Sequence, residues 1–317
     1  MTRIGTSDLN VFPLSLGGNV FGWTADRDAS FAVLDAFTAG GGDFIDTADA
    51  YSAWVPGNSG GESETIIGEW LASRKPQNVV VATKVSQHPD FKGLAAANVR
   101  KAAEASLARL GVDAIDLYYA HFDDETVPLE ETVGAFGQLV TDGLVKNIAV
   151  SNYTGDRIRE WIEIAKRTDV ALPVAVQPHY NLVHRNEVEE TIIPVAEEFD
   201  LGLVPYYSLA SGFLTGKYRS TDAAGQESPR AQGAAKYATD AGLRIIDALE
   251  EIGQAHGASI AATSLAWLRA QPTVAAPIAS ARTVEQVPDL LAGARLELTA
   301  DEVQTLNEVS EWTPTHA

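Results

Sequence analysis

Three strand-like apolar segments of this chain each end in a different titratable side chain: Asp46, Lys84 and His121. The two intervals are almost equal, and each matches the length of one strand–loop–helix unit. Parallel strands one unit apart end at the same rim of a sheet or barrel, so we expect an acid, a base and an imidazole to meet in one pocket. Tyr51 follows Asp46 closely enough to join them.

These four side chains could protonate a carbonyl oxygen. A cationic lysine beside a tyrosine favours the phenolate and makes the phenol a better acid. Asp46 would keep Lys84 charged and in place, and His121 would orient the substrate oxygen. No side chain supplies a reductant, so a redox reaction at Tyr51 needs a hydride cofactor. Taken singly, each residue could instead be a turn residue or part of a structural ion pair, but the shared interval favours a joint role.

The later strand-like segments end in Ser151, Asn152, Gln177 and Tyr206. Hydroxyl and amide groups can hold a carboxamide, and a tyrosine ring offers a flat face for a heteroaromatic ring. Nicotinamide has both features, so this rim is predicted to bind it. The alternative is that Ser151 and Asn152 cap a helix while Gln177 satisfies buried backbone.

Ser280 and Arg282 precede a predicted helix at residues 284–291. A helix N-terminus with a serine and an arginine beside it suits a phosphate group. This end of the site is predicted to hold the adenosine phosphate of a dinucleotide, and Arg282 favours NADP over NAD. The alternative is a surface arginine with no ligand.

Alternating strands and helices indicate an α/β fold, a single (β/α)8 TIM barrel over residues 1–317 with extended loops at its C-terminal rim. An open doubly wound sheet would carry a G-x-G-x-x-G turn after its first strand, which residues 16–22 lack. Insertions at 52–61 and 212–237 are expected to shape substrate access. The predicted strands are 11–16, 43–46, 79–84, 115–121, 147–151, 174–177, 202–206 and 274–278. The predicted helices are 28–39, 62–73, 95–110, 129–141, 156–166, 187–199 and 243–255.

Composition narrows the function further. The net charge is −20, from 23 basic and 43 acidic residues, which argues against nucleic acids and anionic membranes as partners. There are no cysteines, so disulfides, thiol catalysis and zinc–thiolate sites are excluded. No apolar run is long enough to span a membrane and no signal peptide is evident, so a cytoplasmic location is expected. The oligomeric state stays open.

An ordered set of motifs resembles the aldo-keto reductase superfamily from residue 11 to about residue 291. The motifs are FIDTADAY at 44–51, GESE at 61–64, ATK at 82–84, DLYYAH at 116–121, IAVSNY at 148–153, QPHYNL at 177–182 and GFLTGK at 212–217. The resemblance implies a (β/α)8 barrel and NADPH-dependent reduction of aldehydes or ketones. It also implies that Tyr51 is the general acid, that Lys84 and Asp46 tune it, and that His121 orients the carbonyl.

The same resemblance implies a set of cofactor contacts. Asp46, Ser151, Asn152, Gln177 and Tyr206 would surround nicotinamide. The other implied cofactor residues are Gly18, Asn19, Leu209, Ser211, Lys217, Ser280, Arg282 and Gln286. Two positions depart from the family pattern, since Tyr207 stands where a serine is common and Leu290 where an asparagine is common.

The expected substrate is a small carbonyl compound or the corresponding alcohol. Trp23, Trp54 and Tyr153 are expected to form aromatic walls beside Tyr51 and His121, able to accept sugars or aryl aldehydes. Both tryptophans could equally be packing residues.

Two other functions stay open at this stage. One is an NADPH-binding sensor resembling potassium-channel beta subunits. The other is a metal-dependent barrel hydrolase, although His179 and His184 lack the partners of a metal site, and no metal is predicted.

Overall fold

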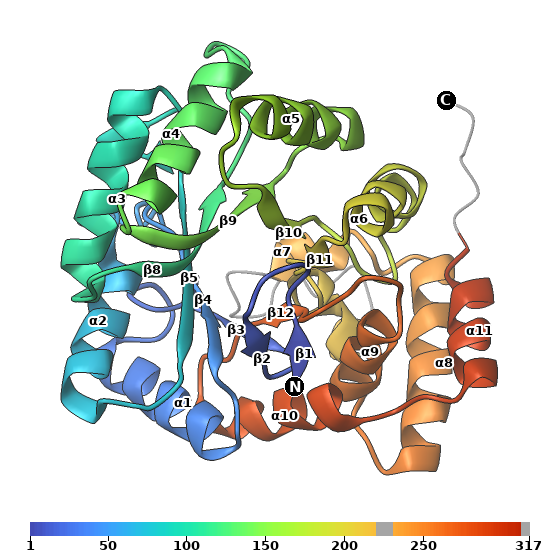
Figure 1. The fold of residues 1–317 in the computed structure, drawn as a ribbon. Helices are drawn as coiled ribbons and strands as arrows, with labels where there is room; N and C mark the ends of the chain where they lie inside the picture. The colour runs from blue at the N-terminus through green and yellow to red at the C-terminus, as the bar shows by residue number, and fades with distance from the viewer. Residues whose placement is uncertain (220–230, 312–317) are drawn as a thin grey trace.

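The computed structural model describes residues 1–219 and 231–311, and an eight-stranded parallel sheet forms its centre (Figure 1). The strands are β3 (Ser15–Gly17), β4 (Phe44–Asp46), β5 (Val80–Val85), β8 (Ile115–Ala120), β9 (Val145–Ser151), β10 (Pro173–Gln177), β11 (Gly202–Leu203) and β12 (Ile278–Ala279). A parallel bridge joins Leu203 to Val274, and the Ile278 N–H donates to the Pro205 carbonyl at 2.8 Å. These contacts bring the last strand back to β11 and close the barrel, which confirms the predicted (β/α)8 fold.

Helices cover the outside of the sheet (Figure 1). They are α1 (Arg27–Ala39), α2 (Glu62–Arg74), α3 (Ala96–Leu110), α4 (Leu129–Thr141), α5 (Gly155–Thr168), α6 (Ile193–Phe199), α7 (Ala231–Ala235), α8 (Asp240–His256), α9 (Ile260–Arg269), α10 (Val287–Arg295) and α11 (Ala300–Val309). Local sequence sets many of their ends. Asp26 and Thr154 cap α1 and α5 by accepting from backbone N–H groups. Gly111 ends α3 in the left-handed conformation, which glycine adopts without strain.

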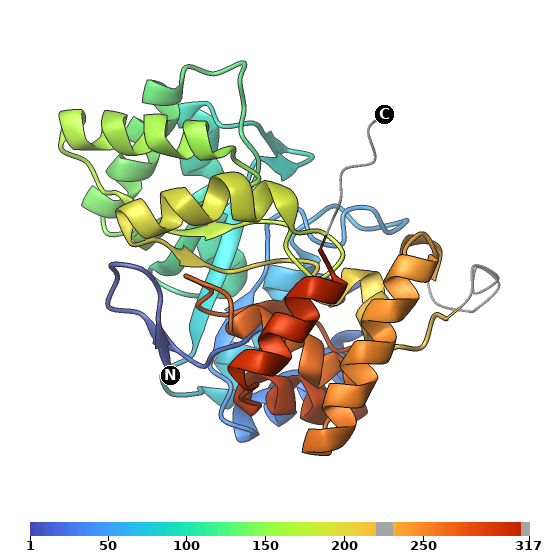
Figure 2. The same cartoon turned by 90° about the vertical axis from the view of Figure 1, so that its right-hand side faces the viewer.

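A hairpin of β1 (Thr2–Arg3) and β2 (Asn10–Val11) closes one end of the barrel (Figures 1 and 2). Its buried Ile4 and Val11 belong to the same apolar cluster as the barrel interior. The prediction of one strand at 11–16 is therefore wrong. Pro13 lacks an N–H and cannot continue a ladder, so the hairpin ends at Val11 and β3 begins at Ser15.

The predicted helix at 187–199 begins differently from expectation. A π-helical turn, η1 (Val188–Ile192), precedes α6. Pro194 provides the physical reason, because it has no N–H to donate to the carbonyl four residues earlier and the turn widens.

Several short elements lie outside the predicted set. Helices α9 and α11 and the hairpin of β6 (Gln87–His88) and β7 (Phe91–Lys92) were not expected. The predicted insertion at 212–237 contains most of the 3-10 segment η2 (Ala210–Thr215) and all of α7, while its residues 220–230 lie outside the described part of the chain.

The barrel interior is filled at the hairpin end by apolar side chains, including Phe44, Ala82, Leu117 and Ala149. Polar side chains lie at the opposite end of the barrel, at the C-terminal ends of the strands. No helix within the described ranges is long and apolar enough to cross a membrane. The extent of a single domain over 1–317 stays a prediction.

Candidate active site

Lys84 lies at the centre of a buried hydrogen-bond cluster. Its Nζ donates to Asp46 Oδ2 at 2.6 Å, to the Thr47 carbonyl at 2.7 Å and to the Tyr51 hydroxyl at 3.0 Å. The neighbouring strands β4 and β5 position Asp46 and Lys84, since Asp46 pairs with Ala82. All three donors of the ammonium group are therefore used, and one of them is directed at the phenol.

Burial shapes the ionisation of this ion pair. Both Asp46 and Lys84 are almost completely buried. Burial raises the pKa of Asp46 and lowers the pKa of Lys84, although the opposite charge of each partner works against both shifts. A lysine with a lowered pKa exchanges a proton with a neighbouring hydroxyl more readily, so Lys84 is suited to a proton relay through Tyr51.

His121 follows the end of β8 and lies beside Tyr51, with ring centroids 6.1 Å apart. Burial, with a smaller contribution from the Lys84 charge, holds the pKa of His121 well below its usual range. The imidazole is therefore neutral at neutral pH. Its Nδ1 is buried and has no hydrogen-bond partner within residues 1–219 and 231–311.

The residues predicted to hold a carboxamide are already linked to one another. Gln177 Nε2 donates to Asp46 Oδ1 at 2.9 Å, and the Ser151 hydroxyl donates to the Gln177 carbonyl at 2.9 Å. Asn152 Nδ2 donates to Ser151 Oγ at 3.0 Å and to the His121 carbonyl at 2.9 Å. This network ties the expected nicotinamide site to both Asp46 and His121.

The tyrosine predicted to stack on nicotinamide is fixed by its own hydroxyl. Tyr206 donates from this group to Asn152 Oδ1 at 2.6 Å. Asn152 adopts a left-handed backbone conformation, φ 57°, which turns its side chain toward these partners.

These groups open into one cavity of about 920 Å³. The predicted site residues that line it are Asn19, Trp23, Asp46, Tyr51, Trp54, His121, Ser151, Asn152, Gln177, Tyr206, Leu209, Ser211, Lys217, Ser280, Arg282 and Gln286. Lys84 lies behind Asp46 and Tyr51 and does not reach the surface of the cavity. Gly18 also stays behind it, with its N–H donating to the Asp46 carbonyl at 2.7 Å, while Gly17 lines the cavity instead.

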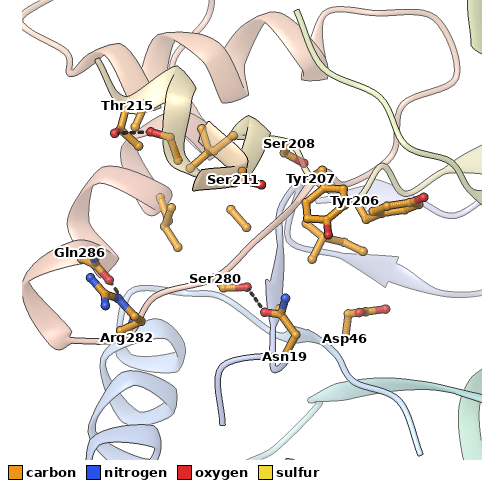
Figure 3. Close-up of a pocket in the computed structure, with 18 of the residues that line it drawn as sticks. Asn19, Asp46, Tyr206, Tyr207, Ser208, Ser211, Thr215, Ser280, Arg282 and Gln286 are labelled. Atoms are coloured by element: carbon orange, nitrogen blue, oxygen red, sulfur yellow. Dashed lines mark hydrogen bonds between the residues drawn. The ribbon is translucent and has the colours of Figure 1, made fainter. Parts of the chain in front are cut away.

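The far end of the cavity is built by the chain around β12. Ser280 Oγ donates to Asn19 Oδ1 at 2.8 Å, and the Arg282 N–H donates to Gln286 Oε1 at 2.7 Å. Figure 3 places Arg282 and Gln286 at the end of the cavity away from Asp46 and Tyr206.

Apart from Asp46, the charged groups that line the cavity come from the segments that follow β11 and β12. Among the described residues, the cations that line the cavity are Lys217 and Arg282. Two carboxylates that the sequence prediction missed, Glu285 and Asp289, line it as well. Glu285 directly precedes Gln286 and Asp289 follows it by three residues, so their place within the predicted helix at 284–291 was a usable signal.

The loop after β11 reaches into the cavity between these two ends. Ala210, Ser211 and Gly212 have φ values of 47°, 58° and 93°, a run of left-handed residues that bends the backbone sharply. Within this turn the Ala210 N–H donates to the Tyr207 carbonyl at 2.7 Å and the Gly212 N–H donates to the Leu209 carbonyl at 2.8 Å, so these two groups hold the turn itself. Lys217, on the same segment, lines the cavity.

Aromatic rings form the wall beside Tyr51. Trp23 and Trp54 meet edge to face at 5.6 Å, and Trp54 lies 6.2 Å from the Tyr51 ring. Phe122, which the sequence prediction missed, lies 5.0 Å from His121 and lines the cavity. Its position directly after the strand-ending histidine was the signal that could have identified it.

Two hydrogen bonds connect the loops that carry these tryptophans. Ser52 Oγ donates to the Phe21 carbonyl at 2.7 Å, and Asn58 Nδ2 donates to the Gly22 carbonyl at 3.1 Å. The aromatic wall is thus tied together in the structure.

Tyr153 does not join this wall. It is 4% exposed and packs edge to face on Trp161 at 5.8 Å, in the layer between sheet and helices. The suggestion that it lies beside the chemistry is therefore wrong, because the chain turns at the left-handed Asn152 after β9 ends and Tyr153 packs into the apolar layer under α5.

Both residues that depart from the family pattern, Tyr207 and Leu290, line the cavity. Tyr207 is 53% exposed, has φ 53° and lines the cavity next to Tyr206 (Figure 3). Leu290 is buried and lines the same cavity.

The fold and the site define a closed (β/α)8 barrel with a buried cluster of Asp46, Lys84 and Tyr51 beside a cavity at the ends of its strands. The chain matches the model of the Aldo/keto reductase family over residues 13–311, and it belongs to that family.

Curated relatives cover nearly the whole chain. An uncharacterized oxidoreductase, YrpG of Bacillus subtilis, is 33% identical over 97% of this chain and 95% of its own. A probable voltage-gated potassium channel subunit beta of Oryza sativa is 32% identical over 90% of this chain and 88% of its own. The norsolorinic acid reductase stcV of Emericella nidulans is 31% identical over 95% of this chain and 78% of its own.

A metal centre finds no support in the described part of the chain, where no group of three or more histidine, aspartate or glutamate residues could hold an ion. His179 and His184 stack on each other instead, with ring centroids 3.9 Å apart.

Proposed function

We propose that this protein is an NADP-dependent oxidoreductase that reduces an aldehyde or ketone to the alcohol. The single observation that carries this proposal is the Lys84 ammonium, which donates at once to Asp46 and to the Tyr51 hydroxyl at the floor of the cavity. Membership of the aldo/keto reductase family supports an oxidoreductase with a nicotinamide cofactor and a small-molecule substrate.

The side chains along the cavity fit a dinucleotide. Ser151, Asn152 and Gln177 would hold the carboxamide, and Tyr206 would stack on the nicotinamide ring. The turned backbone at Leu209 and Ser211, with Lys217, would hold the pyrophosphate, and Asn19 would border it, with Gly17 in the place expected for Gly18. Ser280, Arg282 and Gln286 would hold the adenosine end. When bound, the cofactor supplies the hydride that no side chain of this chain can provide.

Side chains of the protein itself would carry out the proton transfer. Tyr51 donates its hydroxyl proton to the carbonyl oxygen, and Lys84 stabilises the phenolate that results. Asp46 holds Lys84 in place, and the neutral His121 orients the carbonyl by a hydrogen bond. The low polarity around Lys84 strengthens each of these interactions.

Cofactor choice depends on Arg282. A guanidinium group at the adenosine end favours a 2′-phosphate and therefore NADP. Glu285 and Asp289 line the same end and would disfavour additional negative charge, so the preference rests on Arg282 alone.

The substrate that we propose is an aryl or sugar-like carbonyl compound. Trp23 and Trp54, with Tyr51 and His121, would contact it, because aromatic faces accept both kinds of group. One of the relatives is named as a reductase, of norsolorinic acid, which supports reduction as the direction of the reaction.

The test is NADPH oxidation with a panel of aryl aldehydes, sugars and simple ketones, for the wild type and Tyr51→Phe. We expect turnover of at least one carbonyl by the wild type, and loss of turnover with retained NADPH binding in Tyr51→Phe. Full activity of that variant would remove Tyr51 from the mechanism.

A second candidate is an NADPH-binding sensor or accessory subunit, since one group of relatives is named as potassium-channel beta subunits. A wild type that binds NADPH tightly but turns over no carbonyl above background would favour this role.

The remaining expectations are predictions about setting. We propose a cytoplasmic location and no nucleic-acid or membrane partner, in keeping with the net charge of −20. Fractionation of cells that express the full chain tests the location.

A further inference from the structure

Two histidines form a column of rings behind Tyr206. His184 stacks on His179 with centroids 3.9 Å apart and planes 10° apart. His179 in turn lies against Tyr206 at 5.4 Å and 26°. Tyr206 lines the cavity, whereas the two histidines do not. The column therefore backs the ring that faces the cavity.

The backbone holds His179 in this position. The Tyr206 N–H donates to the Pro178 carbonyl at 3.0 Å, and the Tyr180 N–H donates to the Tyr206 carbonyl at 3.4 Å. These bonds form a parallel bridge between His179 and Tyr206. With its hydroxyl bonded to Asn152, Tyr206 is fixed at its backbone, at its hydroxyl and on one face of its ring.

The contact with Asn181 favours the neutral form of His179. The Val183 N–H donates to Asn181 Oδ1 at 2.9 Å, which identifies Nδ2 as the donor end of the amide. Nδ2 donates to the Tyr207 carbonyl at 2.9 Å and lies 3.4 Å from His179 Nε2. Nε2 must then accept, so His179 carries its proton on Nδ1 and is neutral. The pKa of His179 agrees, because burial, with the neighbouring His184, lowers it to about 4.

We propose that His179, backed by His184, is a positioning residue that holds Tyr206 as a rigid platform for the nicotinamide ring. The inference rests on the proposed function, because it requires nicotinamide to stack on Tyr206. A ring that is already fixed loses less conformational freedom when a ligand stacks on it. The neutral imidazole also places no positive charge behind the oxidised form of the ring, which is itself cationic.

The experiment measures NADPH and NADP⁺ affinity of the full chain by fluorescence titration, for the wild type, His179→Ala and His179→Phe. One aromatic contact is worth about a 2- to 10-fold change in affinity. We expect His179→Ala to raise both dissociation constants by about that factor, with a smaller loss of kcat at saturating NADPH. His179→Phe keeps a flat ring and should restore affinity to about that of the wild type.

His256→Ala serves as the matched control. This histidine lies at the surface, where its Nε2 is 2.7 Å from Glu302 Oε1, and we expect its removal to leave cofactor affinity unchanged. Near-ultraviolet circular dichroism and melting temperature establish that each variant is folded. His184→Ala keeps His179 in place, so a smaller increase in the dissociation constants is expected, and it remains informative if His179→Ala does not fold.

The outcomes separate this inference from the proposed function. A wild type with no affinity for NADPH or NADP⁺ would refute the proposed function itself. A wild type that binds while a folded His179→Ala binds equally well would overturn only the role of His179. Weak binding by His179→Phe would also overturn it, since the contact with Asn181 rather than the ring would then matter. Unchanged affinity in His184→Ala would overturn the backing role of His184.

Discussion

The two ends of the cavity are built in different ways. At the inner end, Asp46, Lys84 and Gln177 come from three strands of one barrel and are almost completely buried, and they are joined by hydrogen bonds of 2.6 to 2.9 Å. At the outer end, Arg282 and Gln286 lie on a loop and a short helix, only partly buried, and two carboxylates share the surface.

The inner end carries the residues proposed for proton transfer, and the outer end carries those proposed for cofactor recognition. The barrel fixes the inner groups before any ligand arrives, so proton transfer needs little rearrangement. The outer groups lie on connections whose sequence can change without disturbing the sheet. We therefore expect substitutions at the inner end to affect turnover and folding, and substitutions at the outer end to affect cofactor affinity and choice.

The strongest test of this difference between the two ends is the substitution Tyr51→Phe. Loss of the general acid should lower kcat by about 10²- to 10⁴-fold, because Lys84 then loses the hydroxyl to which it donates. NADPH affinity should change by less than about twofold, since the ring remains. Steady-state kinetics and a binding titration check both parts. A large loss of cofactor affinity would contradict the separation of the two ends.

Lys84→Met tests the inner end as a folding element. Asp46 would keep a buried charge without its partner, which costs about 3–5 kcal/mol of unfolding free energy. Urea denaturation measures this loss. The paired change of Asp46→Asn with Lys84→Met is the control, and it should recover part of the stability because no charge remains buried. Equal stability of Lys84→Met and wild type would show that the ion pair is not required for folding.

Arg282→Ala tests the outer end. Removal of a charge-assisted contact to a phosphate should weaken NADPH binding by about 10- to 100-fold. NADH binding should be nearly unchanged, and kcat at saturating NADPH should stay close to that of the wild type. Titrations with both cofactors measure the ratio. If NADH affinity falls as much as NADPH affinity, Arg282 does not read the 2′-phosphate.

The smallest expected effect concerns pH. The folded protein holds the pKa of His179 at about 4, against about 6.5 for an unfolded histidine. Between these values the unfolded chain takes up a proton that the folded chain does not. Wild type should therefore lose stability relative to His179→Phe as the pH falls from 7 to 5.

Urea denaturation of both proteins at several pH values gives this difference directly. The slope should be below the ~1.4 kcal/mol per pH unit of one full proton, because His179 is partly exposed. A pH-independent difference would show that His179 titrates normally in the folded state.

The fold was largely predictable because strands buried on both faces form unbroken apolar runs. Helix α9 was missed for the opposite reason, since almost every side chain from Ala261 to Leu268 is buried and the segment has no polar face to reveal its period. Helix α11 did have a signal, the capping box of Thr299 and Glu302, which the sequence reading did not use.

The inner end of the cavity was the more predictable of the two, because side chains at the ends of parallel strands meet at one rim of the barrel. Its internal connections were not predictable. Nothing in the sequence indicates that Gln177 donates to Asp46 or that the Tyr206 hydroxyl donates to Asn152 Oδ1, since both contacts depend on the curvature of the closed sheet. The residue roles themselves stay predictions until the variants are measured.

The bonds from Ser52 to Phe21 and from Asn58 to Gly22 have a consequence for engineering. The two segments are some thirty residues apart in sequence but form a single wall. Replacing only one of them with the segment of another barrel would remove the hydrogen-bond partners of the other. A mutant library aimed at new substrate selectivity should replace both segments together. Alternatively, it should keep Phe21, Gly22, Ser52 and Asn58 and vary only the other residues of the two loops.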